Sequence, residues 1–191
     1  MGCDIHLYIE KKKKGKWVMA QGVVADEDGN LNVPYPDLKY TGRNYELFGF
    51  LAGVRNPENQ YFETKGFPKN ASKEVKNIFK SWGRDAHTPS YLTLAELKEV
   101  DWKDRMIKVS GMKQKDQLKK LKKTLKTKNP DYNLLYDYCQ WTNQEDYESF
   151  EVSIPISFYF KDFYRDVVDK ISMYDWRCEK EEIRIVFWFD N

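Results

Sequence analysis

Strict alternation of apolar and polar residues marks the start of the 191-residue chain. In residues 3–9 the odd positions are apolar, and the even positions include Asp4 and His6. Because successive side chains of a strand point to opposite faces, this pattern predicts a half-buried strand with Asp4 and His6 together on its outer face and Cys3 in the core. The turn sequence KKKKGK and the apolar residues 17–25 then predict the second half of a β-hairpin.

The C-terminal residues 183–189 alternate in the same way and predict a closing strand. Residues 150–156 predict a further strand, which Pro155 places at a sheet edge or a bulge. Thr93 and Glu96 have the spacing of a capping box, which starts a helix. Apolar residues at helical spacing predict other helices from Tyr45 to Asn56, over residues 72–80, over the lysine-rich residues 113–128, and near residues 163–171.

Strands at both ends of the chain with helices between them predict an α+β fold. We expect the N-terminal β-hairpin and the C-terminal strands to share one mostly antiparallel sheet that several helices pack against. A chain of 191 residues fits a single domain over residues 1–191. Within it, the lysine-rich stretch predicts a helical insertion near residues 103–128.

Composition and charge narrow the function classes. Aromatic residues make up 16% of the chain, enough to build a core and compatible with a homo-oligomer. The net charge of +2 is too close to neutral to indicate a nucleic-acid partner, and no aromatic residue interleaves with the lysines of residues 113–128. We therefore interpret that segment as a solvated cationic face.

The cysteines and the hydropathy pattern indicate where the protein acts. Cys3, Cys139 and Cys178 are odd in number and form no CxxC pair, which suits free thiols in a reducing cytoplasm. The sequence contains no run of about 18 apolar residues and no apolar signal region near its start. We therefore expect a cytoplasmic protein without a membrane partner.

Two Asp-x-His pairs carry the strongest chemical signal. Asp4 with His6, and Asp85 with His87, include both histidines of the chain. Carboxylate and imidazole groups bind divalent metals and also form acid/base pairs, so the four residues are candidate metal ligands, and His6 and His87 are candidate catalytic residues. The cofactor is otherwise unknown. We expect residues 81–90 to form a loop. In the structural alternative, each histidine is hydrogen-bonded by its neighbouring aspartate, or the aspartate closes a turn of the loop.

A second signal is the start of the predicted helix at Tyr45. Free N–H groups at a helix start attract anions, Arg43 could bind a phosphate, and Tyr45 could stack on a base. Ser90 follows His87 closely enough to extend the same pocket. The alternative is that Arg43 and Asn44 only cap the helix. The sequence contains neither a P-loop nor a GxGxxG motif.

Four blocks of the sequence resemble a group of small uncharacterised bacteriophage proteins that begin MGCDIH and end VFWFDN. The blocks are MGCDIHLYIE, RNYELFGFLAGVRN, SWGRDAHTPSYLTLAEL followed by Asp101 and Trp102, and IRIVFWFDN. The resemblance implies a phage-encoded accessory protein that acts in the cytoplasm of the host bacterium. The blocks contain all of the ligand-binding candidates: Asp4, His6, Arg43, Asn44, Tyr45, Asp85, His87 and Ser90.

Three functions from different classes remain open on this basis. The first is a binder that sequesters a nucleotide-like small molecule, such as a host antiviral defence signal. The second is a metal-dependent phosphoesterase or other hydrolase that cleaves such a nucleotide with the Asp/His pairs. The third is an inhibitor that binds a host protein. Simple binding needs only donors and shape, whereas the sequence shows no complete catalytic motif, so the first hypothesis leads.

Overall fold

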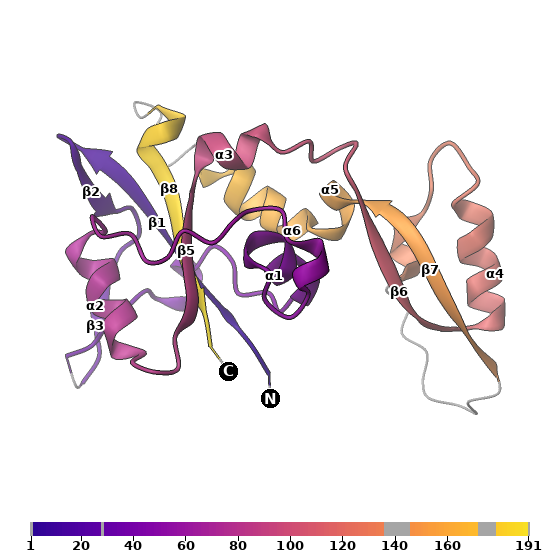
Figure 1. Cartoon of the computed structure of the whole chain (residues 1–191), viewed down its shortest axis with the longest axis horizontal. Coiled ribbons are helices and arrows are strands. Elements are labelled where there is room, and N and C mark those ends of the chain that lie inside the picture. The colour runs from indigo at the N-terminus through magenta and orange to yellow at the C-terminus, as the bar shows by residue number, and fades with distance from the viewer. Residues whose placement is uncertain (1, 28, 136–145, 172–178, 191) are drawn as a thin grey trace. The chain divides into compact units, whose positions relative to one another are not determined.

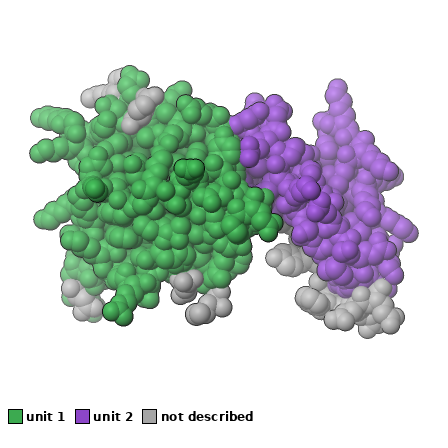
Figure 2. Space-filling view, viewed as in Figure 1, with its two compact units in different colours: residues 1–100, 162–191 green, residues 101–161 purple. Residues whose placement is uncertain are grey.

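The computed structural model describes residues 2–27, 29–135, 146–171 and 179–190 (Figure 1). The chain divides into two compact units, one made of residues 1–100 and 162–191 and the other of residues 101–161 (Figure 2). The second unit is thus inserted in the sequence of the first. That the whole chain folds as a single domain stays a prediction.

The first unit is built on a four-stranded antiparallel sheet in the order β2-β1-β8-β5. Its strands are β1 (Ile5–Lys13), β2 (Lys16–Met19), β5 (His87–Thr93) and β8 (Ile183–Phe189). The predicted N-terminal hairpin and closing strand therefore share one sheet, and the α+β prediction is confirmed. The second hairpin strand is shorter than predicted, because β3 (Val24–Ala25) leaves it to pair with β4 (Leu31–Asn32).

Three helices of the first unit, α1, α2 and α3, begin after a residue whose side chain caps them. Asn44, Ser72 and Thr93 each accept a hydrogen bond from a backbone N–H of the first turn. The helical elements are η1 (Tyr35–Asp37), α1 (Tyr45–Ala52), η2 (Pro57–Asn59), α2 (Lys73–Ser81), α3 (Leu94–Glu99), α6 (Lys161–Phe163), whose first residue belongs to the second unit, the π-helical η5 (Tyr164–Asp169) and η7 (Lys180–Glu182).

Helix α1 ends earlier than the sequence predicts. Gly53 adopts the left-handed conformation, with a φ of 70°, and its N–H bonds back to the Gly49 carbonyl. Glycine takes this conformation without steric cost, so it ends the helix before Asn56 is reached.

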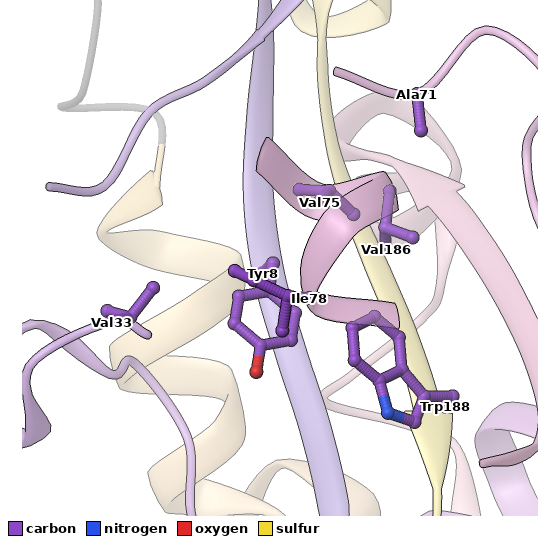
Figure 3. Packing of buried hydrophobic residues seen from close by; sticks show 7 residues of the cluster. All are labelled: Tyr8, Val33, Ala71, Val75, Ile78, Val186 and Trp188. Carbon is purple, nitrogen blue, oxygen red and sulfur yellow. The ribbon is translucent and has the colours of Figure 1, made fainter. Parts of the chain in front are cut away.

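Both faces of the central sheet are covered, so the prediction of an outward-facing polar side of β1 is wrong. Tyr8, Val186 and Trp188 form a cluster with Val33 and with residues on and just before α2: Ala71, Val75 and Ile78 (Figure 3). On the opposite face, Phe189 packs against Phe48 of α1, with ring centroids 5.0 Å apart. The alternation within residues 3–9 does not reveal this, because the covering residues come from elsewhere in the chain.

A buried ion pair joins β1 to β8. Arg184 donates from Nε to Glu10 at 2.8 Å, and the two residues are only 2% and 0% exposed. The other Glu10 oxygen accepts the backbone N–H of Ser72 at 2.6 Å, which ties the start of α2 to the sheet. Arg184 also donates to Asn70 at 3.0 Å and lies 3.9 Å from the ring centroid of Trp17. Their mutual pairing and the contacts with Ser72, Asn70 and Trp17 compensate the buried charges.

The capping box at α3 is confirmed and supports a stability prediction. The Thr93 hydroxyl accepts the Glu96 N–H, and the Glu96 carboxylate accepts the Thr93 N–H at 2.9 Å. We expect Thr93→Ala to lower the free energy of unfolding by about 1 kcal/mol in a urea titration, because the hydroxyl that accepts the Glu96 N–H is lost. Thr64→Ala is the control, since Thr64 is exposed. Equal stability of the two variants would contradict the assigned role of the box.

The second unit consists of a two-stranded antiparallel ribbon with helices beside it. Strand β6 (Met106–Gln114) pairs along its whole length with β7 (Tyr147–Pro155). The strand predicted over residues 150–156 thus belongs to this ribbon and not to the central sheet. The helical elements are α4 (Lys115–Thr124), η3 (Tyr132–Leu135) and α5 (Ile156–Tyr159).

The prediction of a lysine-rich helix is correct in part. Leu118 and Leu121 are buried on α4, as their spacing indicates. The helix nevertheless begins only at Lys115, and the predictions of a helix from residue 113 and of a helical insertion from residue 103 are wrong for residues 106–114, which form β6. Residues 106–114 form a strand because they pair with β7, which is distant in the sequence. A local sequence pattern does not identify this partner strand. In the described part of the chain, no helix has the length and hydropathy needed to cross a membrane.

Candidate functional site

Asp190 joins the two terminal strands at one end of the central sheet. It follows β8 directly, and the pairing of Ile5 with Phe189 places it beside Asp4. Its Oδ1 accepts the Asp4 N–H at 2.8 Å, and its own N–H donates to the Asp4 carbonyl at 3.2 Å. Its Oδ2 lies 3.2 Å from Nε2 of His6. One carboxylate therefore fixes both the backbone of Asp4 and the imidazole of His6.

The imidazole of His6 is held on two further sides by tryptophans. Its ring centroid lies 3.9 Å from that of Trp82, in the turn after α2, and 6.0 Å from that of Trp188 on β8. The side chain is 18% exposed. A neutral His6 that donates its Nε2 proton to Asp190 has Nδ1 as its acceptor. This is a carboxylate-oriented histidine at the rim of a largely covered sheet.

Asp4 binds Arg43, which immediately precedes the N-cap of α1. Nε and Nη2 of Arg43 donate to the two carboxylate oxygens at 2.7 and 2.6 Å. The side chains are 52% and 46% exposed for Arg43 and Asp4. The hydrogen bonds from Arg43 hold the pKa of the Asp4 carboxyl below its ordinary value. A depressed pKa means that the pair is lost only as the pH falls into the acidic range, so it orients Arg43 at neutral pH.

The third guanidinium nitrogen of Arg43 lies against the backbone of Gly2. A Cβ placed on Gly2 would be 2.8 Å from Nη1, closer than real contacts allow, so the end of the Arg43 side chain would have to shift. Arg55 approaches the same residue and donates from Nη2 to the Gly2 carbonyl at 3.3 Å. Two guanidinium groups therefore meet at the start of the chain.

Tyr45 lies next to these arginines. It is the first residue of α1, it is 39% exposed, and the Arg55 guanidinium lies 5.8 Å from its ring centroid. The side-chain oxygen of Asn44 is not available to bind a ligand, because it caps α1 by accepting the Leu47 N–H at 3.1 Å. The capping alternative is thus confirmed for Asn44. We call the following residues the sheet-end cluster: Asp4, His6, Arg43, Tyr45, Arg55 and Asp190.

The second Asp-x-His pair lies apart from the first. His87 is the first residue of β5 and pairs with Phe189, whereas His6 pairs with Trp188. Because adjacent residues of β8 point to opposite faces, the two histidines lie on opposite faces of the sheet. The backbone N–H of Asp85 donates to the Trp82 carbonyl at 3.1 Å, which closes a turn.

His87 and Ser90 have local structural partners. Nδ1 of His87 lies 3.0 Å from the hydroxyl of Thr88, and its Nε2 is buried without a hydrogen-bond partner among the described residues. Thr88 has a φ of 47°, at an irregularity in the pairing with β8. Ser90 is fully buried, and its hydroxyl accepts the Lys65 N–H at 3.1 Å. The loop prediction for residues 81–90 is therefore wrong from His87 onward, because pairing with β8 makes it a strand.

The four Asp and His side chains do not form the predicted common metal site. Across the described ranges, no three His, Cys, Asp or Glu side chains are grouped so that they could hold a metal ion. Cys3 is buried, as predicted, and burial is the main cause that raises the pKa of its thiol. It also faces away from His6, so the two do not make a nucleophile–base pair. Cys139 and Cys178 lie outside the described residues.

Sequence reasoning missed three residues of this region. They are Asp190, Arg55 and Trp82, and no motif of the sequence singles them out. The signal for Asp190 is its position in the terminal FDN, one residue past a strand that was predicted to share a sheet with residues 3–9. Comparisons of the chain with protein-family models, with curated proteins and with solved structures find no match.

Proposed function

We propose that the protein binds a small nucleotide-like anion at the sheet-end cluster and holds it unchanged. The observation that carries this proposal is the geometry of Arg43. Its guanidinium is half exposed and is oriented by the two hydrogen bonds that it donates to the Asp4 carboxylate. Its Nη1 takes no part in these two bonds and lies close to Gly2. A guanidinium that is already oriented loses little freedom when it binds a phosphate, which favours affinity.

The neighbours of Arg43 suit the other parts of a nucleotide. Arg55 supplies a second cation close to Gly2, so that a phosphate group could be bound from two sides. The exposed ring of Tyr45 offers a face on which a base can stack. Asp190 and His6 provide a carboxylate and an imidazole that can bind ribose hydroxyl groups. Together these groups match phosphate, base and sugar.

A second candidate function is hydrolysis of the same ligand. The observation that favours it is the 3.2 Å pair of Asp190 and His6, in which a carboxylate orients an imidazole as in many general bases. Binding remains the first proposal, because the described residues contribute neither a metal-binding group nor a thiol on the side of His6. The His6 ring is also confined by Trp82.

The resemblance to bacteriophage proteins supports a more specific version of the proposal. In that version, the protein is a phage accessory factor in the cytoplasm of the host bacterium, and its ligand is a nucleotide signal of host defence. Capture without cleavage would lower the free concentration of such a signal.

The test is to incubate the protein with a panel of linear and cyclic nucleotides and to analyse two fractions by mass spectrometry. One fraction is the supernatant, and the other is the material released after heat denaturation of the washed protein. We expect an intact nucleotide in the released fraction, also in the presence of EDTA. A cleavage product that disappears in the His6→Ala variant would instead establish hydrolysis. Unchanged supernatant with nothing released would overturn both functions and leave the inhibitor hypothesis.

A further inference from the structure

The positive charge of the chain is concentrated in one short segment of the second unit. Residues 115–128 contain seven lysines and one aspartate, a net charge of +6. The whole chain has a net charge of +2, so the remaining residues sum to −4. The near-neutral total therefore hides two regions of opposite sign, and it does not describe the electrostatic potential around α4.

The lysines of this segment after Lys115 are available to a partner. Lys119, Lys120, Lys122 and Lys123 of α4 are exposed, and within the described part of the chain no ion pair neutralises them. Lys126 and Lys128 extend the exposed charge past the end of the helix. Like charges at this density repel one another. A polyanion that binds to the segment therefore lowers its electrostatic free energy.

The packing of α4 argues against insertion into a membrane. Leu118 and Leu121 are the apolar residues of the helix, and they are 1% and 0% exposed. They are buried where α4 lies against β6 and β7 (Figure 1). A helix that binds at a membrane interface needs an exposed apolar face that can enter the lipid. The apolar face of α4 is buried in the core of the unit.

The residue types select the kind of polyanion. Residues 115–128 contain no arginine and no aromatic residue, so they lack the planar guanidinium that binds a base edge in a fixed geometry, and they cannot stack on unpaired bases. Lysine ammonium groups act as point charges that suit closely spaced phosphates. A duplex presents about one phosphate charge per 1.7 Å of its axis, and α4 with ten residues extends about 15 Å along it.

We propose that the lysines of α4 dock the protein on the phosphate backbone of duplex nucleic acid without reading its sequence. The inference is independent of the sheet-end cluster, which lies in the other unit. It also departs from the expectation drawn from net charge alone. Such binding is electrostatic, so it weakens steeply as the salt concentration rises.

The test measures the affinity of the full chain for a fluorescent 20-base-pair duplex DNA, by anisotropy, between about 50 and 200 mM salt. We expect binding at low salt, with similar affinity for unrelated sequences and a log–log salt slope of several units. The variant Lys119→Glu, Lys122→Glu and Lys123→Glu should bind at least about tenfold more weakly and reduce that slope by about 1 per lysine.

The matched control carries the same change of charge in the turn of the β1–β2 hairpin: Lys13→Glu, Lys14→Glu and Lys16→Glu, all at exposed positions. It should lose less affinity than the α4 variant, and circular dichroism checks that both variants are folded. The proposal is overturned if the wild-type protein does not bind at 50 mM salt, or if the α4 variant binds as well as the wild type. Equal losses in the two variants would also overturn it, because they would show a general effect of net charge.

Discussion

Replacing Arg184 with methionine is expected to lower the free energy of unfolding by about 3–5 kcal/mol. The substitution leaves Glu10 as a buried carboxylate, 0% exposed, whose only remaining partner among those described above is the Ser72 N–H at the start of α2. An uncompensated charge in the interior is far more costly than the loss of a surface pair. Urea titration followed by tryptophan fluorescence measures the effect.

Arg165→Met is the control for this prediction. Arg165 also pairs with aspartates, at 3.0 Å to Asp162 and with Asp166, but its side chain is 58% exposed. We expect this variant to unfold at the same urea concentration as the wild-type protein, because water solvates the aspartate carboxylates that lose their partner. The double variant Glu10→Leu and Arg184→Met should recover part of the lost stability. An Arg184→Met protein as stable as the Arg165→Met protein would contradict the role given to the buried pair.

Arg43→Ala is expected to weaken nucleotide binding by about 10- to 100-fold, the range of charged hydrogen bonds to a phosphate. The loss should appear in calorimetric titration with whichever nucleotide the panel shows to be retained. Arg43→Lys should also bind more weakly than the wild-type protein, since an ammonium cannot bond both oxygens of Asp4 and contact a phosphate with the same fixed geometry.

The control for Arg43 is Arg165→Ala, because both arginines are more than half exposed and both are bonded to a carboxylate. Arg165 lies on η5 and outside the sheet-end cluster, so its loss should leave affinity unchanged. Gly2→Ala provides an independent check, since its Cβ would displace Nη1 of Arg43 while all charges remain. If Arg43→Ala bound the ligand as tightly as Arg165→Ala, the assignment of Arg43 to the phosphate would be wrong.

Local signals predicted much of the fold. The alternation in residues 3–9 and 183–189 identified two strands of the central sheet. Apolar residues at helical spacing identified α2, and the capping box of Thr93 identified the start of α3. These features depend on interactions between residues that are close together in the sequence, so a local sequence pattern is enough to predict them.

Long-range pairing decided the rest. The sequence indicated that Asp4 and His6 share a face, but it could not show that β8 ends beside them and brings Asp190 into contact with both. Nor could it show that β5 pairs so as to place His87 on the other face. A shift of one residue in the pairing register moves every side chain of a strand to the other face of the sheet. Neither Asp-x-His motif alone therefore predicts whether the two motifs lie on the same face.

The central claim is that the sheet-end cluster binds a nucleotide-like anion through Arg43. It is tested most directly by mass spectrometry of the material that heat releases from the wild-type, Arg43→Ala and Arg165→Ala proteins after incubation with the nucleotide panel. The account predicts one intact nucleotide released in comparable amounts by the wild-type and Arg165→Ala proteins and in strongly reduced amount by Arg43→Ala. Release of the same nucleotide in equal amounts by all three proteins, or by none of them, would contradict it.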